Sequence, residues 1–341
     1  MVQVNKGFEV QRAKEEHMDR RDFLKKGTTV AGLTASAGVW PVVAANGKTV
    51  KHQKAVPKRQ LGKTGERLSI IAMGGIVVKG LEQPLANNYV AEAVDRGINY
   101  FDVAPSYGDA EQRLGPALEP YRKNVFLACK TGKRDKEGSQ AELENSLRNL
   151  RTDHFDLYQF HGLTKMEELD KLLGPSGAME TFQAARQAGK IRFIGFSAHS
   201  VETALAALDR VDFDTILFPM NFVLFSQANF GPQVLERARQ KGMGILALKA
   251  MAKSPWPEGQ KDRPNPKCWY QPCAVPDEAT LALRWTLSHT AITAAVPPGD
   301  ENLFRFALDV AQNFKPLNKS EEATLMARAN GTAPIFRLGN A

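Results

Sequence analysis

The sequence has few cysteines and lacks several patterns that define classes of protein. No stretch of about 20 apolar residues occurs, so no membrane-spanning helix or stable membrane anchor is predicted. The six histidines lack zinc-type spacing, so no metal site is predicted. No Gly-x-Gly-x-x-Gly follows an apolar strand, which argues against a Rossmann fold. Low-complexity tracts and signs of a second domain are also absent.

The net charge of +8 does not by itself indicate a nucleic-acid partner. Residues 1–45 hold seven Lys/Arg and five Asp/Glu, and the rest of the chain holds 38 against 32, a charge of +6. These charges are dispersed, without a basic run interleaved with aromatic residues. A solvated surface that weakly attracts an anionic cofactor or substrate is therefore expected, with no nucleic-acid binding.

The three cysteines have two different settings. Cys129 precedes Lys130 on an apolar strand, so alternation turns its side chain toward the surrounding helices as a buried thiol. Cys268 and Cys273 flank Trp-Tyr-Gln-Pro in one loop. A disulfide there and two free thiols both remain open.

The first 45 residues have the features of a targeting segment. Asp-Arg-Arg-Asp-Phe-Leu-Lys-Lys (19–26) precedes a mildly apolar run over 27–40, and Val-Ala-Ala (43–45) is a candidate cleavage site. The order resembles a twin-arginine (Tat) export signal, which implies the Tat machinery as a partner and a periplasmic location. We expect a signal over 1–45, a linker over 46–57 and a folded domain over 58–341. The alternative is a basic tail with an incidental arginine pair.

Three apolar strand patterns each end in polar residues that could form an active site. Asp102 ends the first, and Tyr107 lies in the turn after it. Lys130 ends the second and His161 the third. An ammonium beside a phenol favours the phenolate, so a lysine could make a tyrosine with a pKa of about 10 a better proton donor. An aspartate would hold the lysine charged, and a histidine would polarise a carbonyl.

Each of the four residues also has an ordinary structural interpretation. Asp102 alone is typical of a turn or cap, and Tyr107 of a loop aromatic. Lys130 alone would be a solvated strand end, and His161 a hydrogen-bonded turn residue. Their joint occurrence at successive strand ends favours a reductase site.

The segments that carry these residues resemble the signature segments of the aldo-keto reductases. They are Phe-Asp-Val-Ala-Pro-Ser-Tyr-Gly (101–108), Cys-Lys-Thr (129–131) and Asp-Leu-Tyr-Gln-Phe-His-Gly (156–162), together with Arg-Gln-Leu-Gly-Lys-Thr-Gly (59–65) and Gly-Gly (74–75). The resemblance runs from about residue 59 to 317. It implies a catalytic tetrad of Asp102, Tyr107, Lys130 and His161.

Alternation of strands and helices independently predicts the fold. Strands are expected at 68–73, 100–103, 125–130, 155–161, 191–197, 215–221, 244–250 and 292–296. Helical patterns lie between them at 139–150, 178–188, 201–208, 234–240 and 278–287. Eight such units predict an α/β fold, a single-domain (β/α)8 TIM barrel, with the active site at the carboxyl ends of the strands.

The family resemblance also implies a nicotinamide cofactor. It places Ser197 and Asn221 near the carboxamide or ring, although Ser-Ala-His replaces the usual Ser-Asn. Leu248, followed by Lys249, stands where many members have a stacking aromatic residue. The segment ending in Gly299 and Asp300 leads into a helix N-terminus, which favours anions. Arg305 matches the family's arginine at the 2′-phosphate, so NADP is the default and NAD stays open.

Substrate contacts are expected from the loop over 252–276. It is rich in proline and holds Trp256, Trp269 and Tyr270, so an ordered lid is expected. The alternative is a packed surface insertion. Aromatic rings beside a polar centre suit a sugar, an aldehyde or a ketone.

The expected activity is NAD(P)-dependent hydride transfer between a carbonyl and an alcohol, with Tyr107 as the general acid and base. One alternative is a redox-sensing module that binds the nicotinamide with little turnover. Another is a barrel lyase or aldolase that uses Lys130 as a Schiff base. Measurable turnover would distinguish the first alternative, and borohydride trapping the second.

Overall fold

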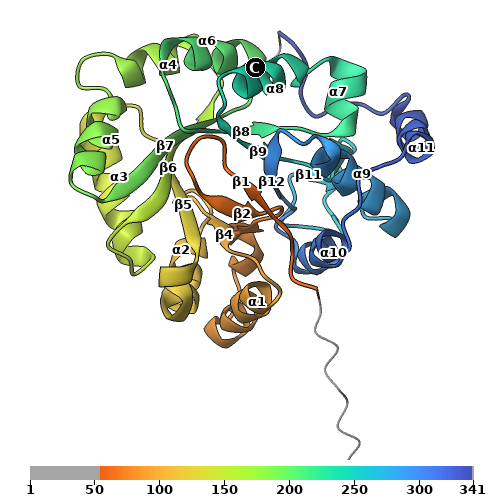
Figure 1. Cartoon of the computed structure of the whole chain (residues 1–341), viewed down its shortest axis with the longest axis horizontal. Helices are drawn as coiled ribbons and strands as arrows, with labels where there is room; N and C mark the ends of the chain where they lie inside the picture. The colour runs from red at the N-terminus through yellow and green to blue at the C-terminus, as the bar shows by residue number, and fades with distance from the viewer. Residues whose placement is uncertain (1–53, 340–341) are drawn as a thin grey trace, which may run out of the picture. The chain divides into compact units, whose positions relative to one another are not determined.

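The computed structural model describes residues 54–339, which form a parallel barrel surrounded by helices (Figure 1). The barrel strands follow one another in chain order around the ring. They are β3 (Met73–Gly74), β4 (Tyr100–Asp102), β5 (Phe126–Thr131), β6 (Phe155–Leu163), β7 (Ile191–Ala198), β8 (Thr215–Pro219), β9 (Gly244–Leu248) and β12 (Ile292–Val296). The predicted (β/α)8 architecture is confirmed.

The ring is completed between its first and last strands. Ile71, just before β3, forms a parallel bridge with Ala295 of β12. The amide of Ala72 donates to the Ala295 carbonyl over 2.9 Å, and the amide of Ala295 donates to the Ile70 carbonyl over 2.9 Å. These bonds satisfy the edge groups that an open sheet would leave unpaired.

Helices cover the outside of the barrel and return the chain to the start of each strand (Figure 1). They are α1 (Gln83–Asp95), α2 (Ala110–Leu118), α3 (Lys136–Asn149), α4 (Met166–Leu173), α5 (Ala178–Gln187), α6 (Val201–Arg210), α7 (Phe222–Ala228), α8 (Pro232–Gln240), α9 (Pro276–Ser288), α10 (Glu301–Gln312) and α11 (Lys319–Ala329). The five predicted helical patterns correspond to α3, α5, α6, α8 and α9.

The amino-terminal end of the barrel is closed by a hairpin, and here the prediction was wrong. The sequence predicts one strand over 68–73, but β2 (Arg67–Ser69) pairs antiparallel with β1 (Lys58–Gln60). The chain joins the barrel wall after β2, first through the bridge of Ile71 to Ala295 and then at β3. The apolar run therefore has two parts. Its start, with Leu68, packs with Leu61 inside the end of the barrel, and its end leads into the barrel wall.

Strand alternation separates the interior of the barrel from the layer beneath the helices. The interior cluster contains Tyr100, Phe126, Ala128, Leu157, Leu217, Leu246 and Ala294. Cys129 has the opposite orientation, as predicted, and is buried with its Sγ 3.5 Å from Glu111 Oε1 on α2. By the same alternation, the polar residues Asp102, Lys130 and His161 at the ends of β4, β5 and β6 share the inward-facing side of their strands.

The folded domain begins slightly earlier in the chain than expected. Val56 is buried, and its amide donates to the Arg96 carbonyl over 2.9 Å. Packing therefore begins within the segment expected as a linker over 46–57. The expected signal over 1–45 lies outside the described residues. Within residues 54–339, helices of the length and apolar character needed to cross a bilayer are not found.

Candidate active site

The structure brings the four predicted catalytic residues together at the carboxyl end of the barrel. Asp102 and Lys130 form a buried ion pair between β4 and β5. Lys130 Nζ lies 5.4 Å from the centre of the Tyr107 ring. The Tyr107 and His161 rings are nearly perpendicular, with centres 5.8 Å apart. An ammonium, a phenol and an imidazole thus face one small region.

Two further residues hold Asp102, and the sequence reasoning missed them. Tyr100 donates its hydroxyl to Asp102 Oδ2 over 3.2 Å, and Gln159 donates its amide to the same oxygen over 3.2 Å. Lys130 also donates to the Val103 carbonyl over 3.1 Å. Tyr100 and Gln159 each lie two residues before a tetrad member on the same strand. The two-residue repeat of a strand could have identified them.

The pKa of Lys130 keeps its side chain charged. Burial disfavours the ammonium, but the carboxylate of Asp102 and the phenol of Tyr107 outweigh burial and raise the pKa above its ordinary value. Asp102 therefore pairs with Lys130 and favours its charged form. Lys130 is a fixed positive charge.

The pKa of Tyr107 is shifted in the opposite sense to the sequence expectation. Burial raises it above the ordinary value of a phenol, and the Asp102 carboxylate adds to the rise. Lys130 lowers it, as predicted, but by less than burial raises it. Tyr107 is consequently a neutral proton donor.

His161 is uncharged at neutral pH. Burial lowers its pKa to about 3, assisted by the positive charge of Lys130 and by three more groups around it, His199, Arg134 and Lys249. Its Nδ1 lies 3.5 Å from Ser106 Oγ. A neutral imidazole can still donate one ring hydrogen to a carbonyl oxygen.

A narrow cleft of about 80 Å³ leads from the catalytic residues across the mouth of the barrel. Asp102 and Tyr107 line one end. The remaining lining is Gly74, Ile76, Leu248, Lys249, Lys267, Cys268, Trp269, Tyr270, Val296, Pro297, Pro298 and Gly299. The cleft therefore joins the tetrad to the ends of β9 and β12.

Comparison with known proteins identifies the family. Residues 71–303, more than half of the chain, match the Aldo/keto reductase family. The chain belongs to the aldo/keto reductase family.

Relatives with assigned names share part of this region. L-galactose dehydrogenase of Arabidopsis thaliana is 29% identical over 216 residues, which are 57% of this chain and 65% of that protein. The 6-dehydroglucose reductase of Novosphingobium aromaticivorans is 32% identical over 171 residues, 44% of this chain and 54% of that protein. An uncharacterized oxidoreductase of Bacillus subtilis is 33% identical over 155 residues, 41% and 48% respectively. The matches span about half to two thirds of these relatives.

Solved structures agree on the fold. An aldo-keto reductase of Bacillus halodurans in its holo form has a TM-score of 0.65 at 22% identity, covering 82% of this chain and 98% of that one. An aldo-keto reductase of Bombyx mori in complex with NADP has a TM-score of 0.60 at 19% identity, covering 80% and 92%. At these identities the likeness concerns the barrel fold.

The segment over 252–275, here called the strap, crosses the cleft of this aldo/keto reductase. Its ends pair as β10 (Ala252–Pro255) and β11 (Tyr270–Pro272). Lys267 Nζ lies 2.8 Å from Glu301 Oε1 and donates to the Val77 carbonyl over 3.0 Å. Asn265 donates to Asp300 Oδ2 over 3.1 Å. The strap is ordered, as predicted, and is fastened on the far side of the cleft.

The aromatic residues assigned to the substrate do not all reach the cleft. Trp269 and Tyr270 line it. Trp256 is outside that lining; its indole N–H donates to the Cys268 carbonyl over 2.8 Å, and its ring packs on Arg263. Trp256 therefore supports the strap from within. Cys268 and Cys273 are both free thiols, which resolves the alternative left open by the sequence.

The residues assigned to the cofactor divide into two groups. Leu248, Lys249 and Gly299 line the cleft. A Cβ added at Gly299 would lie 2.3 Å from Ile76 Cγ2, so only glycine fits this close approach. An apolar flank at Leu248 and a side-chain-free position at Gly299 fit a flat nicotinamide and its linked ribose.

Ser197, Asn221 and Arg305 lie outside the cleft lining. Ser197 Oγ is buried and accepts from the Gly162 amide over 2.8 Å. Asn221 caps α7 and donates to the Lys249 carbonyl over 3.1 Å. Arg305 pairs with Glu92 over 2.7 Å. Their assignment to the cofactor stays a prediction.

The start of α10, predicted as an anion site, already holds a carboxylate. Asp300 Oδ1 accepts from the amides of Asn302 and Leu303, each over 3.0 Å. Glu301 follows in the same turn. These acidic side chains take the place that a phosphate would need at this helix N-terminus.

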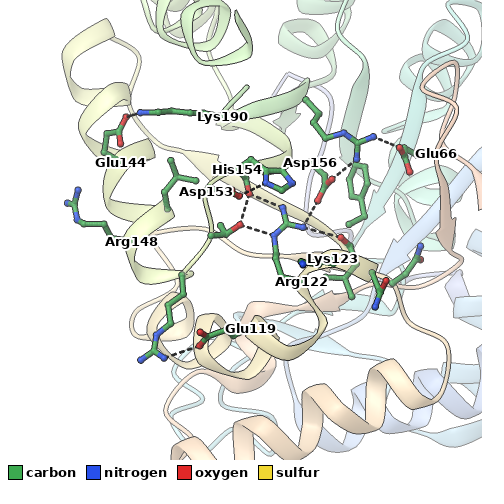
Figure 2. A pocket seen from close by; sticks show the side chains of 18 residues that line it. Glu66, Glu119, Arg122, Lys123, Glu144, Arg148, Asp153, His154, Asp156 and Lys190 are labelled. Carbon is green, nitrogen blue, oxygen red and sulfur yellow. Dashed lines mark hydrogen bonds and ion pairs between the residues drawn. The ribbon is translucent and has the colours of Figure 1, made fainter. Parts of the chain in front are cut away.

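A second, larger hollow lies at the opposite end of the barrel, with a volume of about 1300 Å³ (Figure 2). Most of its charged side chains form ion pairs: Asp156 contacts Arg122 over 3.0 Å and Arg192 over 2.6 Å, and Arg151 contacts Glu119 over 3.1 Å. This end is the one that supports stability in barrels of this type. Residues 54–339 contain no group of three or more His, Cys, Asp or Glu that could hold a metal ion.

Proposed function

We propose that this protein is an oxidoreductase that transfers hydride between a nicotinamide dinucleotide and a carbonyl or alcohol substrate. The observation that carries the proposal is the buried Asp102–Lys130 ion pair facing Tyr107 and His161 at the cleft. Family membership supports it, as do relatives named as a dehydrogenase and a reductase.

The residues of this chain provide the proton chemistry of such a reaction. When bound, the nicotinamide supplies or accepts the hydride. Tyr107 donates its phenolic proton to the substrate oxygen, and Lys130 stabilises the phenolate that remains. His161 donates a hydrogen bond to the same oxygen and polarises the carbonyl. In the direction of alcohol oxidation Tyr107 takes the proton back.

Substitution of Tyr107 tests this mechanism. Tyr107→Phe removes only the proton donor, so kcat should fall by about 100-fold or more while nucleotide affinity stays nearly unchanged. Lys130→Met should also inactivate, and Asp102→Asn should have a milder effect. A Tyr107→Phe enzyme with a near-wild-type rate would exclude the mechanism.

The structure favours the reductase over a lyase that uses Lys130. A Schiff base needs a free amine, but Lys130 is paired with Asp102 and its pKa is raised. A redox-sensing module with little turnover would use the same cleft. Steady turnover with an added carbonyl substrate distinguishes the enzyme from the sensor.

For the nucleotide, we infer that NAD(H) binds at least as tightly as NADP(H), against the default that the resemblance gives. Arg305 is neutralised by Glu92, and Asp300 and Glu301 place acidic groups at the start of α10. A 2′-phosphate would be repelled by these carboxylates, and the Arg305 guanidinium that could attract it is already paired with Glu92. Direct titration of NADH and NADPH into the protein measures the two affinities.

A Glu92→Gln substitution tests the role of Arg305 in that preference. It frees the guanidinium, so NADPH affinity should rise by roughly 3- to 10-fold relative to NADH. Asp309→Asn is the matched control, because Asp309 pairs with Arg96 and not with Arg305. An unchanged ratio in Glu92→Gln would mean that Arg305 does not reach the nucleotide.

We also propose that residues 1–45 direct Tat export to the periplasm. The arginine pair, the apolar run and the small-residue site support this by their order in the sequence. Replacing Arg20 and Arg21 together by lysine should leave the protein uncleaved in the cytoplasm. Equal periplasmic yield from both forms would refute the assignment.

A further inference from the structure

Lys249 is a cationic residue in the cleft that the proposed hydride-transfer chemistry does not use. It follows β9 and has a φ of 62°, in the left-handed region that lysine rarely occupies. Its ammonium lies 5.0 Å from the Trp269 ring centre and 5.3 Å from that of Tyr270. A strained backbone position that aims a charge into a cleft is a common property of binding sites.

Lys249 has no carboxylate partner among residues 54–339, in contrast to Lys130 and Lys267. Burial and the nearby charge of Lys130 lower its pKa to about 8. Two aromatic faces offset only part of the lost hydration of an ammonium. The side chain is half-buried, and its positive charge has no carboxylate to neutralise it within residues 54–339.

A second nitrogen without a hydrogen-bond partner among residues 54–339 lies outside the cleft lining. His199 Nε2 is buried, and no hydrogen-bond partner for it occurs in the described part of the chain. The His199 ring stacks on Phe336 with centres 5.1 Å apart, and Phe336 contacts Trp269 at 5.8 Å. Lys249 is near enough to depress the pKa of His199, which burial lowers to about 3. His199 is thus a neutral group that can donate one hydrogen bond.

Lys249 lines the cleft, whereas His199 lies outside its lining and has a buried Nε2. Lys249 and His199 each act on the charge state of His161, together with Lys130. Gly299 and the acidic start of α10 lie at the other end, where the strap is fastened. Asp102 is committed to Lys130, so the acid nearest the reacting region does not neutralise Lys249.

We propose that Lys249 forms a subsite for the anionic group, a carboxylate or phosphate, of the carbonyl substrate. Lys249 supplies the charge, and Trp269 and Tyr270 form the apolar wall between the anion and the carbonyl. His199 supports that wall through Phe336. This inference rests on the proposed function and names its substrate class. The substrates are acidic aldehydes, acidic ketones or acidic sugars, in place of the neutral carbonyl compounds that the sequence left equally open.

The test compares two aldehydes that differ in one charge, para-carboxybenzaldehyde and its neutral methyl ester. The wild-type enzyme should have the higher kcat/KM for the acid. Lys249→Met should lower the ratio of kcat/KM for the acid to kcat/KM for the ester by roughly 10- to 100-fold. Met is unbranched like Lys, so the backbone demand is matched. Lys249→Arg should retain the preference, and so should His199→Phe, which keeps the stacking on Phe336.

Controls separate this inference from the proposed function. Lys63→Met removes an exposed lysine at the far end of the barrel and should change neither aldehyde. Equal losses for acid and ester in Lys249→Met would overturn the subsite. Weakened NADH or NADPH binding with the acid preference intact would also overturn it, because the anion would then belong to the nucleotide.

If the wild-type protein reduces neither aldehyde, the result counts against the proposed function. A binding experiment then tests the anion subsite by itself. Terephthalate has two carboxylates and no reducible carbonyl, so it is titrated calorimetrically into wild type and Lys249→Met, with and without NADP⁺. Binding that is lost in Lys249→Met supports the subsite whatever the reaction. Equal binding to both proteins, or none to wild type, refutes it.

Discussion

Asp102 is held more firmly than an ion pair with Lys130 alone would allow. Tyr100 and Gln159 both donate to its Oδ2, which leaves Oδ1 for the lysine. Burial and the neighbouring carboxylate raise the pKa of Tyr100 well above its ordinary value, so this phenol stays a donor. Rotation of the carboxylate would therefore break two neutral hydrogen bonds as well as the ion pair. This holds Lys130 in one position.

The raised pKa of Tyr107 predicts a specific pH dependence. Because reduction needs the neutral phenol, kcat for carbonyl reduction should be level from about pH 6 to 9 and fall only above about pH 10. Alcohol oxidation, which needs the phenolate, should rise over the same upper range. The profiles are measured in both directions with saturating substrates.

Lys130→Met provides the check on that profile. Lys130 lowers the pKa of Tyr107, so its removal should move the remaining alkaline limb to higher pH. If kcat for reduction already fell near neutral pH in the wild-type enzyme, the fall could not be assigned to Tyr107. A fall at lower pH in Lys130→Met than in the wild type would contradict the assignment as well.

Some residue contacts could be read from the sequence and others could not. Asp102, Lys130 and His161 were predictable because each ends an apolar strand, where parallel strands bring their ends together. The net pKa of Tyr107 was not, since it depends on burial by segments distant in sequence. The pair between Arg305 and Glu92 joins α10 to α1, and no local pattern indicates it.

The strap forms one side of the cleft through Lys267, Cys268, Trp269 and Tyr270. Ligand pockets typically have volumes of roughly 300–1,000 Å³, whereas this cleft has about 80 Å³. We therefore expect the strap to move when a dinucleotide enters. Its fastening through Lys267 to Glu301 and to the Val77 carbonyl sets how easily that happens.

Lys267→Met should accelerate nucleotide release. The substitution removes one ion pair and one hydrogen bond from the closed strap, so the dissociation rate should rise by roughly 10-fold or more. Stopped-flow displacement of bound NADH measures it. Lys261→Met, an exposed lysine of the same strap, is the control and should leave the rate unchanged. Equal rates in wild type and Lys267→Met would mean that the strap does not limit release.

At the scale of elements, apolar strand runs were the most reliable signal. The seven predicted strands from 100–103 onward coincide with β4 to β9 and β12 to within two residues at each end. The segment over 68–73 was wrong because hydrophobicity alone does not distinguish a residue that plugs the barrel from one that lines its wall. The β10–β11 pair was missed because its strands are short and 14 residues apart.

The two ends of the barrel differ in how their charges are balanced. At the amino-terminal end, Asp156 contacts both Arg122 and Arg192, and Lys190 pairs with Glu144 (Figure 2). At the other end, Lys249 has no carboxylate partner and His199 Nε2 has no hydrogen-bond partner among the described residues. Strand and helix alternation predicted the barrel as a whole, but this contrast depends on pairs between distant helices and loops.

Two histidines predict how the stability of the whole molecule depends on pH. His161 and His199 have folded-state pKa values of about 3, below the ordinary value of 6.5. The unfolded chain therefore binds protons that the folded chain does not, and stability is full above about pH 6.5 and lost as pH falls toward 3. The loss should approach about 1.4 kcal/mol per pH unit for each histidine.

Denaturant unfolding at about pH 6.5 and pH 5 measures this slope, in a range above the ordinary titration of carboxylates. His199→Phe should reduce the slope by about half while retaining the contact with Phe336. A slope that is the same in both proteins would show that His199 titrates normally in the folded state.

The three buried thiols give this molecule internal reporters of its own opening. Thiol reagents attack the thiolate, and burial raises the pKa of Cys129 well above its ordinary value and that of Cys268 to about 12. Cys268 lies in the strap, whereas Cys129 lies in the barrel wall. Alkylation of Cys268 therefore records brief openings of the strap, and alkylation of Cys129 records unfolding of the wall. Bound nucleotide should strongly slow the alkylation of Cys268. It should slow the alkylation of Cys129 only by stabilising the whole fold.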